Sequence, residues 1–129
     1  MNRFQMFRRD ETGSLSIEFV MWLPVFAFLL VLAGDATMAF MNQSRMWQVS
    51  RETARIVSRY GMDELTAEAY AAKLATMQAT VPTVDVSFAS AKVQVEMTMP
   101  LAAMAPFGLL DFAMSNDITV TVTHAMEPI

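Results

Sequence analysis

An uninterrupted apolar run near the start constrains the fold of this chain more than any other feature. From Phe19 to Gly34, sixteen residues pass without a charged side chain. As a helix with a rise of about 1.5 Å per residue, this run covers roughly 24 Å, short of a hydrocarbon core about 30 Å thick. A span that starts at Ser14 reaches about 31 Å, but it places Glu18 inside the membrane. We therefore expect a transmembrane helix over residues 14–41 with one carboxyl group in an apolar setting, where an ionisable group usually marks a function.

The two flanks of this helix are polar. Residues 1–13 contain Arg3, Arg8 and Arg9 and are predicted to form a cytoplasmic leader. Asp35 follows the apolar run and is expected at the far interface, where a charge costs little. Pro24 removes one backbone hydrogen bond and should kink or loosen the turn before it.

The bulk composition excludes several kinds of partner. The chain has 129 residues, which favours one domain. Its formal net charge is −4, which argues against a nucleic-acid partner because phosphate binding needs a basic surface. The sequence contains no cysteine, so disulfides, thiolate chemistry and Cys-ligated metals are excluded.

The helical pattern continues to about Tyr60. An apolar stripe follows helical spacing at Met46, Val49, Thr53, Val57 and Tyr60. On the opposite side lie Arg51, Arg55 and Arg59, a row of like charges that should be solvated or should meet an acidic partner; the solvated face is the favoured interpretation. After a break at Gly61, Asp63 is expected to cap a second helix that runs to about Ala79. Its inward side chains would be Tyr70, Leu74 and Met77.

After Pro82 the apolar period changes from about 3.6 to 2, which predicts three half-buried strands. Their inward residues are Val84, Val86 and Phe88, then Val93, Val95, Met97 and Met99, then Ile118, Val120 and Val122. A short turn at Ser90–Ala91 should join the first two as an antiparallel hairpin. The predicted class is therefore α+β: a long N-terminal transmembrane and amphipathic helix, a second helix and a small three-stranded antiparallel sheet, with residues 42–129 as the periplasmic domain.

The connection from Leu101 to Met114 is unusually apolar. Pro106 and Gly108 interrupt it, and a short helix is expected from Leu109. Phe107, Leu109, Leu110 and Phe112 are too apolar for a free loop. Burial in the core is the favoured interpretation; contact with a partner or with the membrane surface is the alternative.

No catalytic motif is recognisable. His124 is the only histidine, and the sequence lacks a Gly-rich phosphate loop, a nucleophile elbow and metal-ligand spacing. Asp63, Glu64 and Glu68 are explained by the start of a helix, where acidic side chains are favourable. We therefore expect no enzyme activity, no cofactor and no metal.

The leader carries the most informative motif. The segment "RRDETGSLSIEF" has a basic stretch ending in Gly13, a carboxylate at Glu18 five residues later, an aromatic residue at Phe19, and then the apolar run. This order resembles a class III signal peptide, the substrate of prepilin peptidases. Cleavage after Gly13 would free the amino group of Ser14. A neighbouring subunit's amine could then neutralise Glu18 in the membrane and fix the register of an assembly.

Within that class the chain resembles the TadE/TadG-like minor pseudopilins of the tight-adherence (Flp) pilus system. The resemblance rests on the leader, on "VMWLPVF" and on "QVSRETARIVSRYG", nearly all in the N-terminal third. It implies cleavage at Gly13–Ser14 by a prepilin peptidase and single-pass insertion in the bacterial inner membrane. It further implies other pilus subunits and inner-membrane assembly proteins as partners, in pilus assembly, adhesion or secretion.

Two observations leave an alternative open. Arg45, Arg51, Arg55 and Arg59 follow the membrane segment, so the positive-inside rule does not clearly favour a cytoplasmic N-terminus. Val31-Leu32-Ala33 before Gly34 also resembles an ordinary signal-peptidase site. On that interpretation the chain is a secreted periplasmic binding domain, or a tethered one if the anchor is not cleaved.

Overall fold

The structure, a computed structural model, describes residues 12–114 and 116–127, with side chains from residue 16 onward. Most of the leader predicted over residues 1–13 therefore lies outside the described part. The elements in chain order are α2 (Thr12–Ser58), α3 (Glu64–Ala75), β1 (Thr83–Ala89), β2 (Lys92–Pro100), α4 (Leu101–Met104), α5 (Leu109–Met114) and β3 (Asp117–Ala125). The α+β class, with its long apolar first helix, second helix and three-stranded antiparallel sheet, is confirmed.

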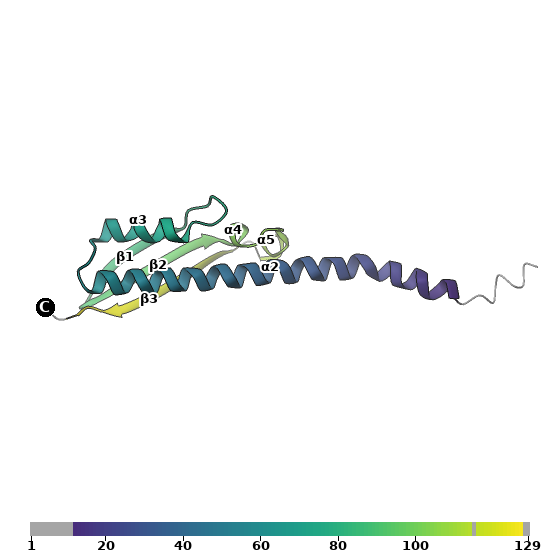
Figure 1. Cartoon of the computed structure of the whole chain (residues 1–129), viewed down its shortest axis with the longest axis horizontal. Coiled ribbons are helices and arrows are strands. Elements are labelled where there is room, and N and C mark those ends of the chain that lie inside the picture. The colour runs from purple at the N-terminus through teal and green to yellow at the C-terminus, as the bar shows by residue number, and fades with distance from the viewer. Residues whose placement is uncertain (1–11, 115, 128–129) are drawn as a thin grey trace, which may run out of the picture.

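Helix α2 is one continuous element of 47 residues, about 70 Å long. Its C-terminal half lies along the sheet, and its N-terminal half projects beyond the folded domain as a stalk (Figure 1). Pro24 lies within the helix without ending it, and the stalk bends only gently. The boundary predicted between residues 41 and 42 stays a prediction, since no break in the helix marks it.

The sheet has the order β1-β2-β3, with both pairs antiparallel. The predicted hairpin turn is confirmed: Ser90 and Ala91 both have positive φ, 49° and 61°, as the two central residues of a type I′ turn require. β3 reaches the other side of β2 through α4 and α5. Val95 is the central partner, opposite Val86 on one side and Val122 on the other.

Helices cover one face of this sheet: α2 lies over β2 and β3, and α3 over β1 (Figure 1). The side chains of β2 that point toward the helices, Val93, Val95, Met97 and Met99, are all buried. The opposite face carries polar side chains. There the Thr98 and Thr119 hydroxyl oxygens lie 2.9 Å apart across the strands. The predicted alternation is therefore confirmed except at Phe88, which was expected to face inward and is 48% exposed near the end of β1. One sheet face remains polar.

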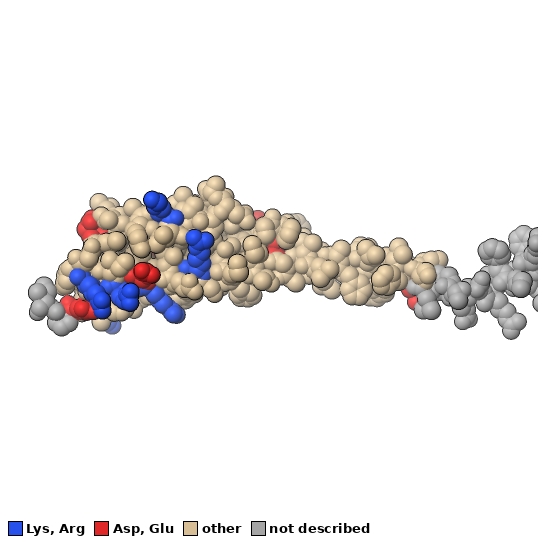
Figure 2. Space-filling model, in the orientation of Figure 1, with Lys and Arg blue, Asp and Glu red and all other residues tan. Residues whose placement is uncertain are grey.

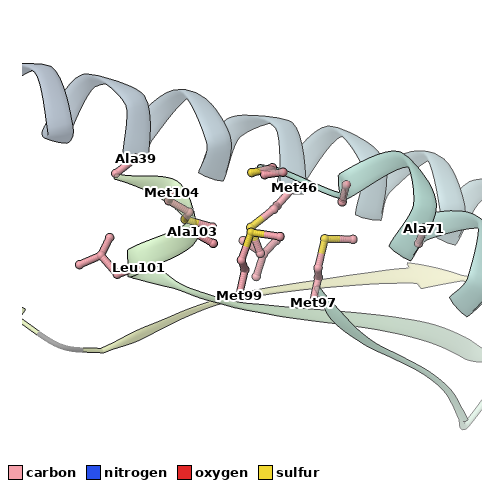
Figure 3. Packing of buried hydrophobic residues seen from close by; sticks show 11 residues of the cluster. Ala39, Met46, Ala71, Met97, Met99, Leu101, Ala103 and Met104 are labelled. Atoms are coloured by element: carbon pink, nitrogen blue, oxygen red, sulfur yellow. The ribbon is translucent and has the colours of Figure 1, made fainter. Parts of the chain in front are cut away.

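Methionines fill the core beside the junction of helix and sheet. Met46 from α2 meets Met97 and Met99 from β2 and Met104 from α4, and all four are fully buried (Figure 3). Unbranched thioether side chains fill irregular space between elements that do not interdigitate regularly. A second cluster, toward the far end of the sheet, is built from smaller residues, among them Ala54, Val57 and Val93.

Helix α3 differs from its prediction in length and in orientation. It begins after Asp63 as expected but ends at Ala75 rather than near Ala79, because Gln78 and Ala79 adopt positive φ in a tight turn. Its buried residues are Ala67, Ala71 and Ala75. Tyr70 is only half-buried and Leu74 is exposed, so the predicted inward face is wrong; only Met77, in the turn, is buried. Alanines on the inner side let α3 approach α2 closely, which the larger side chains would prevent.

The buried stripe of α2 is confirmed for Met46, Thr53 and Val57, with Val49 half-buried. Tyr60 is exposed because the helix ends at Ser58. Within this stripe the hydroxyl oxygens of Ser50 and Thr53 are buried without a hydrogen-bond partner among the described residues.

An unpartnered buried hydroxyl costs about 1–3 kcal/mol. We therefore expect Thr53→Val, which keeps the shape of the side chain, to stabilise the folded domain by about 1 kcal/mol and raise its thermal midpoint by a few degrees. Circular dichroism of the full chain in mild detergent measures the shift. Thr121→Val, on the exposed sheet face, is the control and should change little. An unchanged or lower midpoint for Thr53→Val would show that this hydroxyl is satisfied in the folded protein.

Candidate functional site

The stalk of α2 exposes an apolar surface that no part of the described chain covers. The large side chains exposed along it are Ile17, Phe19, Val20, Met21, Trp22, Leu23, Val25, Phe26, Phe28, Leu29 and Leu30. A contiguous surface of this size is not stable in water. By length and composition, α2 is a helix that could cross a membrane, compatible with a single-pass anchor.

Charge on the stalk is confined to its N-terminal end. Figure 2 shows a tan shaft between the folded domain and one acidic spot beside the grey residues. The sequence contains no other charge between residue 16 and Asp35 than Glu18. Glu18 and Phe19 are both exposed on the helix surface. Gly13 and Ser14 lie in the first turn of α2 by backbone, and their side-chain positions fall outside the described part. Cleavage there, and the role of Glu18, stay predictions.

At its other end the stalk is joined to the domain through Asp35. The carboxyl group of this residue is fully buried. It accepts three backbone hydrogen bonds, from Phe107 N at 2.8 Å, Leu109 N at 2.7 Å and Leu110 N at 3.3 Å. Leu109 and Leu110 open helix α5, so Asp35 satisfies amides that have no partner within that helix. One carboxyl group therefore ties α2 to the connection between β2 and β3.

Two glycines make this approach possible. Gly108, between two of the donating residues, has φ of 74°, a conformation that favours glycine. On α2, a Cβ placed at Gly34 would lie 3.3 Å from the ring of Phe107, so the absence of a side chain lets that ring rest on the helix.

Further polar contacts continue along α2 in the direction of the domain. Asn42 Nδ2 donates to the Met104 carbonyl at 3.0 Å, and an Arg45 guanidinium nitrogen donates to the Leu74 carbonyl at 3.0 Å. Leu74 is in the last turn of α3, where carbonyl groups lack helical partners and a cation is favourable. These bonds fix α4 and the end of α3 against α2.

One expectation about this junction stays a prediction and another is corrected. Asp35 was expected at the far membrane interface, which the structure does not test; its carboxyl group is buried and bonded to backbone amides. Phe107 and Phe112, expected in the core, are exposed, the latter at 92%. The physical reason is that α5 is held through its backbone, so that Leu109, Leu110 and Asp111 are only partly buried. The short helix beginning at Leu109 is confirmed.

Asp35 is the residue that sequence reasoning missed. Its only local signal is a single carboxylate directly after the apolar run. Its partners lie 72 to 75 positions away, in an apolar segment that contains no complementary side chain. Because every residue except proline has a backbone N–H group, this pairing leaves no recognisable pattern in the sequence.

An apolar groove lies beside the junction, with a volume of about 370 Å³. Its walls come from α2, α5 and the start of β3, and include Phe40, Leu110, Met114 and Ile118. Its polar lining residues are Gln43, Asn116 and Asp117.

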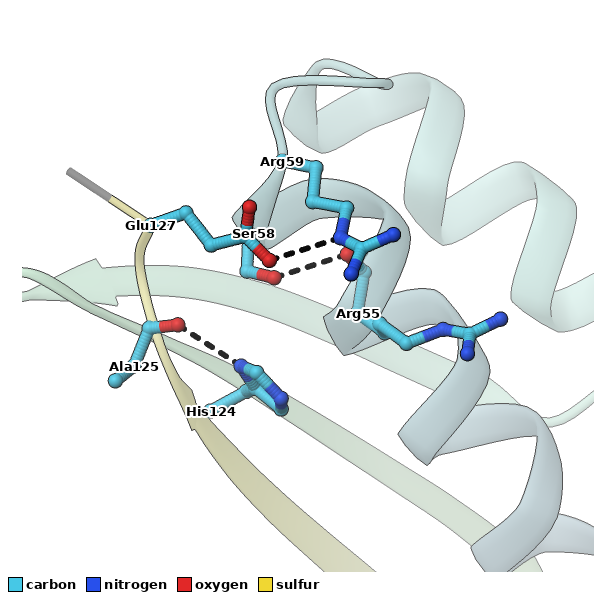
Figure 4. Close-up of polar contacts among 6 residues, drawn as sticks. All are labelled: Arg55, Ser58, Arg59, His124, Ala125 and Glu127. Atoms are coloured by element: carbon cyan, nitrogen blue, oxygen red, sulfur yellow. Dashed lines mark hydrogen bonds and ion pairs between the residues drawn. The ribbon is translucent and has the colours of Figure 1, made fainter. Parts of the chain in front are cut away.

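The predicted basic row lies at the domain end farthest from the stalk. Arg51, Arg55 and Arg59 are all exposed. The Arg51 guanidinium sits 5.7 Å from the Trp47 ring centroid, and Arg59 Nε pairs with Glu127 Oε1 at 2.9 Å (Figure 4). An exposed pair of this kind adds little stability. The solvated face and contact with an acidic partner both remain open.

The remaining polar groups form no metal centre. Among residues 16–114 and 116–127, no three His, Asp or Glu side chains are placed to hold a metal ion. His124 is exposed at the end of β3, with Nδ1 2.8 Å from the Ala125 carbonyl oxygen (Figure 4). Glu68, from the predicted acidic cluster, accepts a hydrogen bond from Val86 N at 3.1 Å and so occupies one amide of the edge strand β1.

Comparison with known proteins finds a similarity that is confined to the N-terminal helix. The family model described as TadE-like protein matches residues 13–55. The matched segment contains the stalk, Glu18, Asp35 and most of the helix that packs on the sheet. This part of the chain is therefore similar to TadE-like proteins, as the leader and the helix that follows it predicted. No curated protein and no solved structure matches the chain.

The Asp35 junction makes a direct prediction. Asp35→Asn keeps the side-chain shape but replaces one acceptor oxygen by a donor, so at least one buried amide loses its partner. We expect a loss of about 2–3 kcal/mol in the free energy of unfolding. Backbone hydrogen exchange in detergent should quicken first at Phe107, Leu109 and Leu110. The matched control is Asp117→Asn, since Asp117 is exposed. Equal protection of these amides in the two variants would refute the junction.

Proposed function

We propose that this chain is a minor pseudopilin of a Flp/Tad-type pilus, a structural and assembly subunit with no enzyme activity. One observation carries the proposal: an exposed apolar stalk whose only charge between residue 16 and Asp35 is Glu18, five residues after Gly13 and within the TadE-like match. In this proposal α2 anchors the chain in the bacterial inner membrane, and the folded domain stands in the periplasm.

Processing would begin at Gly13–Ser14, with a prepilin peptidase as the first partner. Both residues lie in the first helical turn, so the mature chain would start as a helix. Glu18 is four residues from Ser14 and therefore lies about one turn, or roughly 6 Å, along the axis. A carboxylate in hydrocarbon needs a counter-charge. In the proposed assembly this counter-charge is the N-terminal amine of a neighbouring subunit that is shifted along the assembly axis.

The stalk itself argues for neighbours of the same kind. It is exposed on all sides, with side chains from Ile17 to Leu30 turned outward around the helix. Lipid covers such a surface before assembly, and apolar helices of other subunits can replace the lipid afterwards. Pairing at Glu18 would then set the register between helices that otherwise slide freely, which is the best-attested use of a buried ion pair.

The secreted-domain alternative fits the structure less well. A signal peptidase acting before Gly34 would cut within continuous helix, and it would leave Asp35 as the second residue of the product. The residue that binds α5 would then sit at a fraying end. A tethered domain with an intact anchor keeps the junction, but it gives no role to Glu18.

Replacement of Glu18 tests the proposal. Glu18→Gln removes the charge while retaining a polar side chain far from the folded domain. We expect normal membrane insertion and an unchanged domain, but at least about a tenfold loss of pili recovered from the cell surface, because losing one member of a buried pair costs several kcal/mol.

Glu64→Gln is the matched control, since Glu64 is exposed at the start of α3 and should have no effect. Pili in normal number and stability from the Glu18→Gln strain would remove the assembly role proposed for Glu18.

A further inference from the structure

Helix α5 (Leu109–Met114) and Phe107, just before it, expose large apolar side chains to their surroundings. Phe112 is 92% exposed, Phe107 64% and Met114 58%. We propose that α5 is a membrane-contact element: these three side chains insert into the interfacial layer of the bilayer from which α2 emerges. This inference rests on the proposed function only through the membrane position of α2.

The depth of α5 follows from the bonds at Asp35. A span from Ser14 to Gly34 matches the hydrocarbon thickness, which puts Asp35 at its outer boundary. Leu109 N lies 2.7 Å from Asp35 Oδ2, so the start of α5 is at the same level. Phe112 is three residues farther, at most about 4.5 Å along α5. The headgroup layer is about 5–7 Å deep on each side, so Phe112 lies in it if α5 runs parallel to the bilayer or tilts away from it, and in the outermost hydrocarbon if α5 tilts inward.

The same level is marked independently on α2. The ring of Phe107 would touch a Cβ at Gly34, the last residue of the uncharged run. About 7–9 Å beyond the boundary, at the outer edge of the headgroup layer, Phe40 and Met41 are exposed on α2 itself. Aromatic and methionine side chains from two elements therefore surround the point where the helix leaves the membrane, and aromatic residues are favoured at this depth.

The composition of α5 identifies the kind of surface it contacts. The helix reads LLDFAM, with one acidic residue and no basic one. Attraction to anionic headgroups requires Lys or Arg, so docking here depends on apolar burial alone. Contact should therefore be the same on neutral and on anionic bilayers.

Docking has a consequence for the far end of the domain. From Asp35 to Ser58, α2 continues for about 35 Å, and the exposed arginines cluster at that end (Figure 2). A rigid helix fixed at Asp35 and seated through α5 holds the domain at one tilt. The basic end is then presented away from the bilayer, toward other subunits.

The chain lacks cysteine, so single spin labels report on chosen sites in the full-length protein. The test variant is Phe112→Cys, with Met114→Cys as a second position on α5. Leu29→Cys marks the span, and Leu65→Cys, at an apolar residue that is 75% exposed on α3, marks the aqueous domain. Each protein is reconstituted in phosphatidylcholine vesicles, with and without phosphatidylglycerol, and circular dichroism checks the fold.

Accessibility to oxygen, which concentrates in lipid, and to a water-soluble nickel chelate gives the depth of each label. We expect the label at residue 112 to be at least about threefold less accessible to nickel than the label at residue 65, as for a side chain 5–10 Å into the interface. The nickel accessibility of the label at residue 112 should lie between those of the labels at residues 29 and 65. It should be the same with and without phosphatidylglycerol.

Three results would overturn the inference, and they differ from a failure of the proposed function. If the labels at residues 112 and 114 were as accessible to nickel as the label at residue 65, while the label at residue 29 lay in lipid, the domain would be anchored but would not dock. Spin–spin broadening at residue 112 with low access to both reagents would show contact with a second protein copy. A label at residue 29 in water would remove the anchor, and with it the proposed function.

Discussion

The buried carboxyl group of Asp35 is the contact on which the rest of the structure depends. Without its three bonds, the connection between β2 and β3 would leave buried amides without partners, at a cost of about 1–3 kcal/mol for each. With them, α5 is held at the base of the stalk, α4 is placed over Met99, and β3 returns along β2. The contact also couples the stalk to the folded domain at Asp35.

A single helix serves two environments in this molecule. The first half of α2 is apolar on every side and lacks any cover from the described chain. The second half buries one stripe against a sheet and exposes arginines on the other side. The change occurs at Gly34–Asp35, without a break in the backbone. If α2 spans the membrane as proposed, the position of the span is transmitted directly to the folded domain, which suits an assembly held together by helices.

Local periodicity explains what could be predicted from the sequence. The strands and the turn at Ser90–Ala91 were predicted correctly because alternation and turn position are local properties, and the apolar run predicted the stalk. The inward face of α3 was not, because alanines at 67, 71 and 75 carry little hydrophobic signal beside Tyr70 and Leu74. The exposure of Phe112 depends on Asp35, a partner far away in sequence that bonds to backbone. Neither hydropathy nor spacing records such a contact.

The central claim is that the stalk is a processed, pilin-type span, and the mass of the mature chain tests it most directly. The protein is purified from membranes of cells with and without the prepilin peptidase, and its N-terminus is determined by mass spectrometry. The account predicts a chain that starts at Ser14 only when the peptidase is present. A chain that starts at Met1 in both cells, or at Gly34 in either, would contradict it.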